Sequence, residues 1–246
     1  MKPQQARVYL EGVVLGLVRA DLEQPSTRKD ARKLSPHLYE ALKRALYKPA
    51  AFFKGIVFPL LDVCANFSLS GNILLFIPRA QGGCTLKEAA IVASVLTKVK
   101  VPLLHSSAAL IRLAGMDYSG TSLPFPHSTP FSKRKKTRNT GPTSLFIRVL
   151  LDKKHALPYK VLDALVFHFI RLANTHAQGE LPVLWHQSLL VLSQRYAAHL
   201  APEQKDALRD VVRAHPHPQI SHEIRRELAT APARGESTQQ DAMDVS

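Results

Sequence analysis

The chain has 246 residues, of which 46% are hydrophobic and 21% are charged, and its formal net charge is +14. This balance is typical of a folded globular protein and excludes a chain that is disordered throughout. The positive charge predicts attraction to polyanions such as nucleic acid or an acidic membrane surface, and a basic but inert surface is the alternative. Two cysteines exclude both a disulfide framework and a zinc site built from four cysteines.

The first part of the chain favours three helices. Leu38, Leu42 and Leu46 recur at four-residue spacing, which places them on one face of an amphipathic helix. Pro36 and Pro49 suit the first turn of a helix, where the missing amide hydrogen costs nothing. The predicted helical segments are 6–24, 36–48 and 49–61.

The remainder of the chain favours seven more helices. Thr85 and Glu88 have the spacing of a capping box, and Ser221 suits an N-cap. Pro102 and Gly115 show the asymmetry expected of the two ends of one helix. The predicted segments are 85–99, 102–115, 144–154, 157–174, 181–200, 202–215 and 221–229.

These helices follow one another through short connections, which predicts antiparallel packing of neighbours. We therefore expect an all-α fold: an α-solenoid-like superhelix of antiparallel helix pairs forming one domain over residues 1–230. Because no strict repeat is visible, a compact helical bundle is the alternative. Residues 62–83 and 121–143 are rich in Ser, Pro, Gly and Asn and are predicted to be disordered insertions, and 231–246 a disordered tail.

The sequence lacks the motifs of catalysis. It contains no glycine-rich phosphate loop and no Gly-x-Ser-x-Gly elbow, and His105, His168 and His186 each stand alone in a helix. We expect no enzymatic activity, no cofactor, no metal site and no homo-oligomer. The most apolar stretch, "PLLDVCANFSLSGNILLFIP", carries Asp62 and two asparagines, so no membrane insertion is expected. With no secretory signal, the chain is predicted to be a soluble intracellular protein.

Basic residues near predicted helix ends are the candidate nucleic-acid contacts. Turns of a solenoid align along an edge, so charges in successive turns can add into a stripe. Lys160 lies near a helix start, where the dipole disfavours a cation and a phosphate would be stabilised. The alternative is a set of solvated turns. The predicted contacts are Lys43, Arg44, Lys48, Lys153, Lys154 and Lys160.

The chain resembles the carboxy-terminal half of the bystin family, assembly factors of the small ribosomal subunit. The resemblance is carried, in the same order, by "HLYEALKRALYKPAAFFKGI", "CTLKEAAIVASVLTKVKVPLLHSSAALIRLAGMDYSG", "LFIRVLLDKKHALPYKVLDALVFHF", "LPVLWHQSLLVLSQRY", "EQKDALRDVVRAHPHPQ" and "HPQISHEIRREL". It implies a helical scaffold without enzymatic activity that binds precursor particles in the nucleus and nucleolus and later accompanies the maturing subunit to the cytoplasm. The implied partners are small-subunit precursor rRNA with its small nucleolar RNA, ribosomal proteins and other assembly factors. The family also implies an alternative role as a cytoplasmic adaptor in a cell-adhesion complex.

The chain departs from the family pattern in three places. The family's amino-terminal half is absent, and residues 62–83 and 121–143 stand where the family has short connections. We interpret both segments as read-through of non-coding sequence or as splice-variant segments. The second contains "KRKK", which has the pattern of a nuclear-localisation or phosphate-binding patch.

Overall fold

The computed structural model describes residues 2–23, 34–61, 86–116, 140–175 and 181–234. In these ranges the chain is helical and contains no strand, which confirms the all-α prediction. The elements are α1 (Pro3–Tyr9), η1 (Leu10–Val14), α2 (Leu15–Glu23), α3 (Pro36–Ala45), α4 (Pro49–Phe52), η2 (Phe53–Val57), α5 (Phe58–Leu61), α6 (Leu86–Lys98), α7 (Leu103–Gly115), α8 (Thr140–Leu151), α9 (Tyr159–Thr175), α10 (Val183–Tyr196), η4 (Ala197–His199), α11 (Pro202–Ala214) and α12 (Ser221–Thr230).

Several predicted boundaries need correction or cannot be compared. The segment 140–143, predicted as part of an insertion, is the first turn of α8. Residues 62–83, 121–139 and 235–246 lie outside the described ranges, as does Thr85 of the predicted capping box. Ser221 is the first residue of α12 instead of its N-cap, and its hydroxyl accepts a hydrogen bond from the backbone amide of His217 at 2.6 Å.

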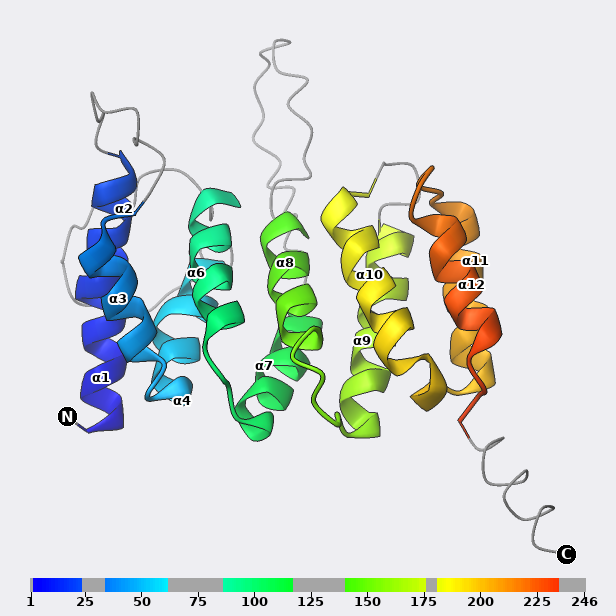
Figure 1. The fold of residues 1–246 in the computed structure, drawn as a ribbon, viewed down its shortest axis with the longest axis horizontal. Helices are drawn as coiled ribbons and strands as arrows, with labels where there is room; N and C mark the ends of the chain where they lie inside the picture. Colours follow the sequence, from blue (N-terminus) through cyan, green and yellow to red (C-terminus); the bar gives the residue numbers. More distant parts are fainter. Residues whose placement is uncertain (1, 24–33, 62–85, 117–139, 176–180, 235–246) are drawn as a thin grey trace, which may run out of the picture.

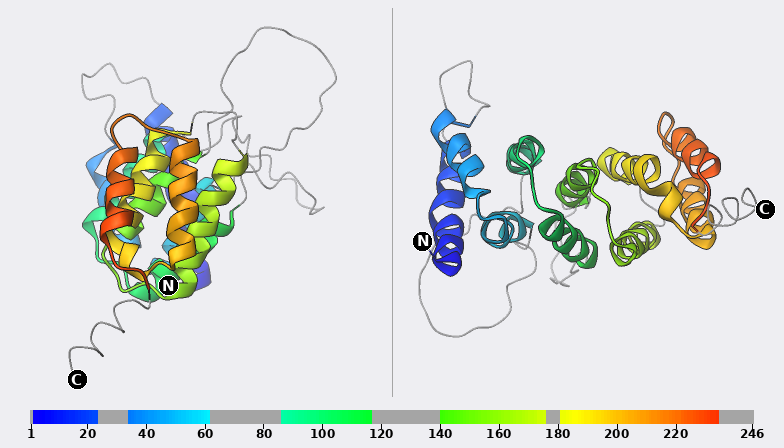
Figure 2. Two further views of the ribbon diagram at one scale, coloured as in Figure 1. Left: turned by 90° about the vertical axis from the view of Figure 1, so that its right-hand side faces the viewer. Right: turned by 60° about the horizontal axis from the view of Figure 1, so that its bottom comes forward.

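The helices form two rows, as Figures 1 and 2 show. One row contains α6, α8, α10 and α12, each packed on the next, and α3 contacts α6. The other row contains α7, α9 and α11. The chain alternates between the rows, so consecutive helices run in opposite directions. This stacking in sequence order is that of an α-solenoid and not of a compact bundle.

The core lies between the rows. Trp185 of α10 is fully buried, and the ring of Phe169 from α9 packs against it edge-on, with the ring centroids 5.7 Å apart. From α8, Phe146 and Leu150 complete this layer. The segment from Ser144 to Phe169 is therefore mostly apolar because it supplies both rows with core residues.

His168 is a buried histidine with a backbone partner. Its Nδ1 lies 3.2 Å from the carbonyl oxygen of Ala114, at the end of α7. Burial lowers the pKa of His168 from 6.5 to about 4, because the charged imidazolium loses its hydration and the hydrogen bond to Ala114 compensates only in part. The side chain is neutral near pH 7 and joins α9 to α7.

The first helix runs through α1, η1 and α2, and packs on the helix formed by α4, η2 and α5. Its buried residues Ala6, Leu10, Val14 and Val18 recur every four residues. On a regular α-helix this spacing would drift by about 40° per step, and the π-helical turn of η1 offsets part of that drift. A Cβ placed on Gly55 would lie 2.9 Å from the carbonyl oxygen of Arg7, so the two helices approach closely only because residue 55 is glycine.

Candidate nucleic-acid interface

The turns that follow α3, α6, α8 and α10 lie at one edge of the solenoid. Figure 1 shows this edge at the bottom, where α3, α6, α8 and α10 end. The three turn regions 39–48, 97–101 and 152–155 carry seven lysines and arginines and two carboxylates. We call their basic members the edge cluster: Lys43, Arg44, Lys48, Lys98, Lys100, Lys153 and Lys154. Cations at helix C-termini are stabilised by the exposed carbonyl dipoles.

Lys153 belongs to the scaffold of this edge. Its ammonium group donates hydrogen bonds to the carbonyl oxygens of Thr97 at 2.7 Å and Val99 at 2.9 Å, at the end of α6. Partial burial lowers the pKa of Lys153, and the nearby Asp152 carboxylate opposes that shift. Lys153 thus donates to carbonyl oxygens at the end of the neighbouring helix α6, and not to those of its own helix, α8.

Tyr39 links two further lysines of the edge cluster. The Lys43 and Lys98 ammonium groups lie 5.6 Å and 5.2 Å from the centroid of its ring, and its hydroxyl is 3.2 Å from Ser94 Oγ. Burial raises the pKa of Tyr39, but the hydrogen bond with Ser94 and the nearby Lys98 and Lys43 outweigh burial and lower it from its usual 10.0. Tyr39 therefore holds two cations of different helices beside one ring.

The turn after α8 is fixed from both sides. Arg195 at the end of α10 pairs with Asp152 at 3.0 Å, and the Tyr196 hydroxyl donates to the carbonyl oxygen of His155 at 2.9 Å. Lys154 adopts φ = 56°, the left-handed conformation in which glycine is the usual residue. Lys154 thus has a strained backbone conformation, and its side chain is exposed in this turn.

The six predicted nucleic-acid contacts differ in their position and in their neighbours. Lys43 and Arg44 share the carboxylate of Glu40, at 3.1 Å and 4.0 Å. Lys48 is exposed in the turn after α3. Lys160 is exposed in the first turn of α9, in the other row from α3, α6 and α8. The structure therefore brings Lys43 and Lys153 to the end of α6 and places Lys160 on a different row.

The Bystin family model matches this chain over residues 1–70 and 70–238. Bystin of Rattus norvegicus is 45% identical over 234 residues, which are 95% of this chain and 43% of the rat protein. Bystin of Drosophila melanogaster is 43% identical over 93% of this chain and 42% of its own length. An uncharacterised protein of Schizosaccharomyces pombe is 46% identical over 96% of this chain and 42% of its own length.

The chain belongs to the bystin family. It spans less than half the length of the curated bystin relatives that it matches, for example 43% of the rat protein. The matched region includes the whole two-row solenoid and the edge cluster.

In this bystin-family chain, sequence reasoning missed Lys98, Lys100 and the aromatic residues Tyr39 and Tyr47. Lys98 and Lys100 are exposed at the end of α6, and Tyr47 is 95% exposed beside Lys48. A signal was available, because "TKVKVP" ends a helix with two lysines before a proline, as "DKKHALP" does. Tyr39 could not be found in this way, because its partners Ser94 and Lys98 are more than fifty residues away.

The described residues of this bystin-family chain hold no group of three or more His, Cys, Asp or Glu side chains placed to bind a metal ion. The same residues include no helix long and apolar enough to cross a membrane.

Proposed function

We propose that this chain is a non-enzymatic ribosome biogenesis factor, a scaffold that docks on precursors of the small ribosomal subunit. Membership of the bystin family carries the proposal. The resemblance of this chain to that family implies a role in the maturation and processing of small-subunit rRNA and in the export of the precursor. The two-row solenoid supports it, since such a scaffold presents long surfaces for docking other macromolecules. The proposed partners are precursor rRNA with small nucleolar RNA, ribosomal proteins and other assembly factors, in the nucleolus, nucleus and later the cytoplasm.

The edge cluster is the proposed surface for RNA phosphates. Lys98, Lys100 and Lys154 are exposed in two neighbouring turn regions, and Lys43, Arg44 and Lys48 lie in the third. Lys153 contributes positive potential while its ammonium group holds the end of α6. Tyr47, exposed next to Lys48, can stack on an unpaired base. Lys160 remains a predicted contact of the other row.

Two cellular measurements test the proposed function. Tagged protein should cosediment with small-subunit precursor particles, and its depletion should cause unprocessed small-subunit rRNA to accumulate. Unchanged rRNA processing after depletion would remove the basis of the proposal. A cytoplasmic adhesion adaptor, the competing function, would instead bind protein tails and show no salt-dependent affinity for rRNA.

A salt titration tests the edge cluster. The variant Lys98→Gln/Lys100→Gln/Lys154→Gln should bind structured rRNA more weakly, and the slope of log affinity against log salt should fall by up to about three. The matched control is Lys87→Gln/Arg213→Gln/Arg225→Gln, which removes three exposed charges of α6, α11 and α12 that lie outside the edge cluster. Equal losses in both variants would show that total charge, and not this edge, determines binding. Retained helicity by circular dichroism completes the control.

A further inference from the structure

The outward face of α7 is apolar, although α7 has a helix on each flank. Leu104 and Ile111 are 75% and 40% exposed, and with the exposed Ala108 they recur at the four- and three-residue spacing of one helix face. On one flank, the guanidinium of Arg112 lies 4.3 Å from the centroid of the Phe58 ring of α5. On the other flank, α7 packs against α9. The open face therefore belongs to a helix inside the solenoid and not to one of its ends.

Phe167 extends this apolar face onto α9. It is 64% exposed, and the guanidinium of Arg171, one turn further along α9, lies 5.9 Å from its ring centroid. The same guanidinium donates a hydrogen bond at 2.9 Å to the carbonyl oxygen of Ala114, at the end of α7. Phe167 thus lies on the side of α9 that is nearer to α7. We call the exposed apolar residues of the two helices the apolar strip: Leu104, Ala108, Ile111 and Phe167.

The next helix of the same row exposes charged side chains instead. Glu203, Asp206 and Asp210 are exposed on α11. Asp206 pairs with Arg209, and Asp210 pairs with Arg213. Ionised groups of this kind are usual on a helix face in contact with water. A strip of large apolar side chains on α7 and α9 is typical instead of a surface that binds another protein segment.

The charge around the apolar strip is positive. The structure describes every residue of α7 and α9, and these two helices contain one carboxylate, Asp163. Asp163 accepts a hydrogen bond at 2.8 Å from Gln204 of α11, so it lies on the flank of α9 away from α7. The cations of the two helices are Arg112, Lys160 and Arg171. A segment with Asp or Glu beside its apolar residues would therefore complement the strip, and a basic segment would be repelled.

We propose that the apolar strip binds an acidic amphipathic helix of a partner protein. Two helices packed side by side present the ridges of side chains against which a third helix packs, with its apolar face on Leu104, Ile111 and Phe167. Its border carboxylates would meet the guanidinium groups of Arg112 and Arg171, which match a carboxylate in shape and charge.

A protein segment is favoured over RNA at this face because aliphatic side chains such as Leu104 and Ile111 offer a phosphate no partner. Lys160, predicted as a phosphate contact, would meet a carboxylate of the partner helix instead. The inference goes beyond the proposed docking on RNA and does not depend on the edge cluster.

The test measures the binding of two synthetic helical peptides to the whole chain by fluorescence anisotropy. Both peptides carry leucine at positions i, i+4, i+7 and i+11, flanked by glutamate in one peptide and by lysine in the other. The glutamate peptide should bind about tenfold more tightly than the lysine peptide, and added salt should reduce this difference. Leu104→Ser/Phe167→Ser should weaken binding of the glutamate peptide about tenfold, because it removes the apolar contacts.

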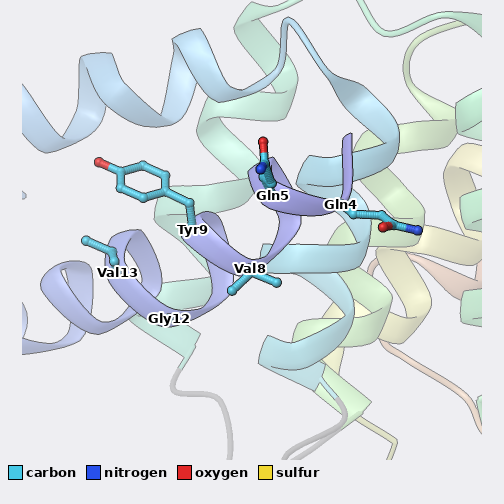
Figure 3. A pocket seen from close by; sticks show the side chains of 6 residues that line it. All are labelled: Gln4, Gln5, Val8, Tyr9, Gly12 and Val13. Atoms are coloured by element: carbon cyan, nitrogen blue, oxygen red, sulfur yellow. The ribbon is translucent and has the colours of Figure 1, made fainter. Parts of the chain in front are cut away.

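The matched control is Val8→Ser/Val13→Ser, which removes two exposed apolar side chains from the first helix, shown in Figure 3. This variant should bind the glutamate peptide as tightly as the unchanged chain. Circular dichroism of both double variants establishes that each is folded before the binding result is read.

Four outcomes would overturn the inference. The glutamate peptide could fail to bind at about 1 mM, or the two peptides could bind equally well. Equal losses in the strip variant and in the control would show that exposed apolar residues bind the peptide wherever they lie. Finally, Leu104→Ser/Phe167→Ser could abolish binding of single-stranded oligouridine or a dimer of the chain itself, in which case the occupant is RNA or a second copy.

Discussion

The two ends of the solenoid differ in how they meet solvent. At the end formed by α11 and α12, the outward surface carries ion pairs between side chains three residues apart, such as Arg213 with Asp210 at 3.2 Å. At the end formed by α1, η1 and α2, the outward surface carries Val8, Val13 and Leu17. Because the same helical geometry serves both ends, the difference lies in which side chains face outward.

The ends also differ in how their last turns are held. Lys205 of α11 is buried, and its ammonium group donates to the carbonyl oxygens of Ala231 and Pro232, both at 2.8 Å. Arg234 then lies over the Tyr159 ring at 3.6 Å. Residues 231–234, predicted as the start of a disordered tail, are thus part of the folded solenoid. The first helix instead relies on close backbone packing at Gly55.

Removal of the Lys205 ammonium should have the largest effect. Lys205→Met keeps the apolar stem but leaves the carbonyl oxygens of Ala231 and Pro232 without this charged donor, and should cost about 3 kcal/mol of unfolding free energy. Urea unfolding measures the loss, and hydrogen exchange should show α12 opening before α1. The exposed Lys87→Met is the control. A loss below about 1 kcal/mol would mean that water replaces the ammonium group.

Acid should weaken the middle of the solenoid, which connects the two ends. The pKa of His168 is depressed in the folded state to about 4, so the unfolded chain binds the extra proton between pH 6.5 and 4. Stability is therefore fully present above pH 6.5 and should fall by about 3 kcal/mol as the pH decreases to 4. His168→Asn should lack this part of the pH dependence. Parallel urea curves for both proteins across this range would contradict the prediction.

At the end formed by the first helix, a substitution at Gly55 should disturb the packing and one at Gly12 should not. Gly55→Ala forces a methyl group against the Arg7 carbonyl and should cost about 2 kcal/mol through displacement of the first helix. Gly12→Ala meets no neighbour and should stabilise the chain by about 0.5–1 kcal/mol through helix propensity. Thermal unfolding of the two variants provides the measurement. Equal effects would show that the first helix is not packed as described.

The ion pairs on the charged end should have the smallest effect. Asp210→Asn removes the partner of Arg213, but both side chains are more than 70% exposed, so the cost should stay below about 0.5 kcal/mol. The value of this pair lies in keeping the end polar and not in stability. A loss above about 1 kcal/mol at moderate salt would assign the pair a structural role.

Most of the helices were predictable because their signals are local. The spacing of Leu38, Leu42 and Leu46, and the prolines at 36, 49 and 202, correctly indicated where α3, α4 and α11 lie. The predicted segments 102–115 and 181–200 begin one and two residues before α7 and α10, because Pro102 and Pro182 are the N-caps of these helices. The same local logic failed at Ser221, whose hydroxyl turns back to the loop before α12.

The candidate interface was predictable only in part. A basic turn after α8 can be read from "DKK", but Lys153 donates to carbonyl oxygens 54 and 56 residues away, at the end of α6. No spacing within the chain encodes that contact. The pairing of Lys43 and Lys98 beside Tyr39 likewise depends on α3 packing against α6.

The sequence by itself determined that this chain is all-helical, basic and a member of the bystin family, because composition, periodicity and motif order are properties of neighbouring residues. Only the tertiary structure decided which lysines hold helix ends and which face solvent, and which apolar residues remain uncovered. Those outcomes depend on the order in which helices stack, since burial and hydrogen-bond satisfaction are properties of residues distant in the chain. For this reason Lys153 and Lys154 are neighbours in sequence, yet one satisfies the end of α6 and the other is exposed at the edge.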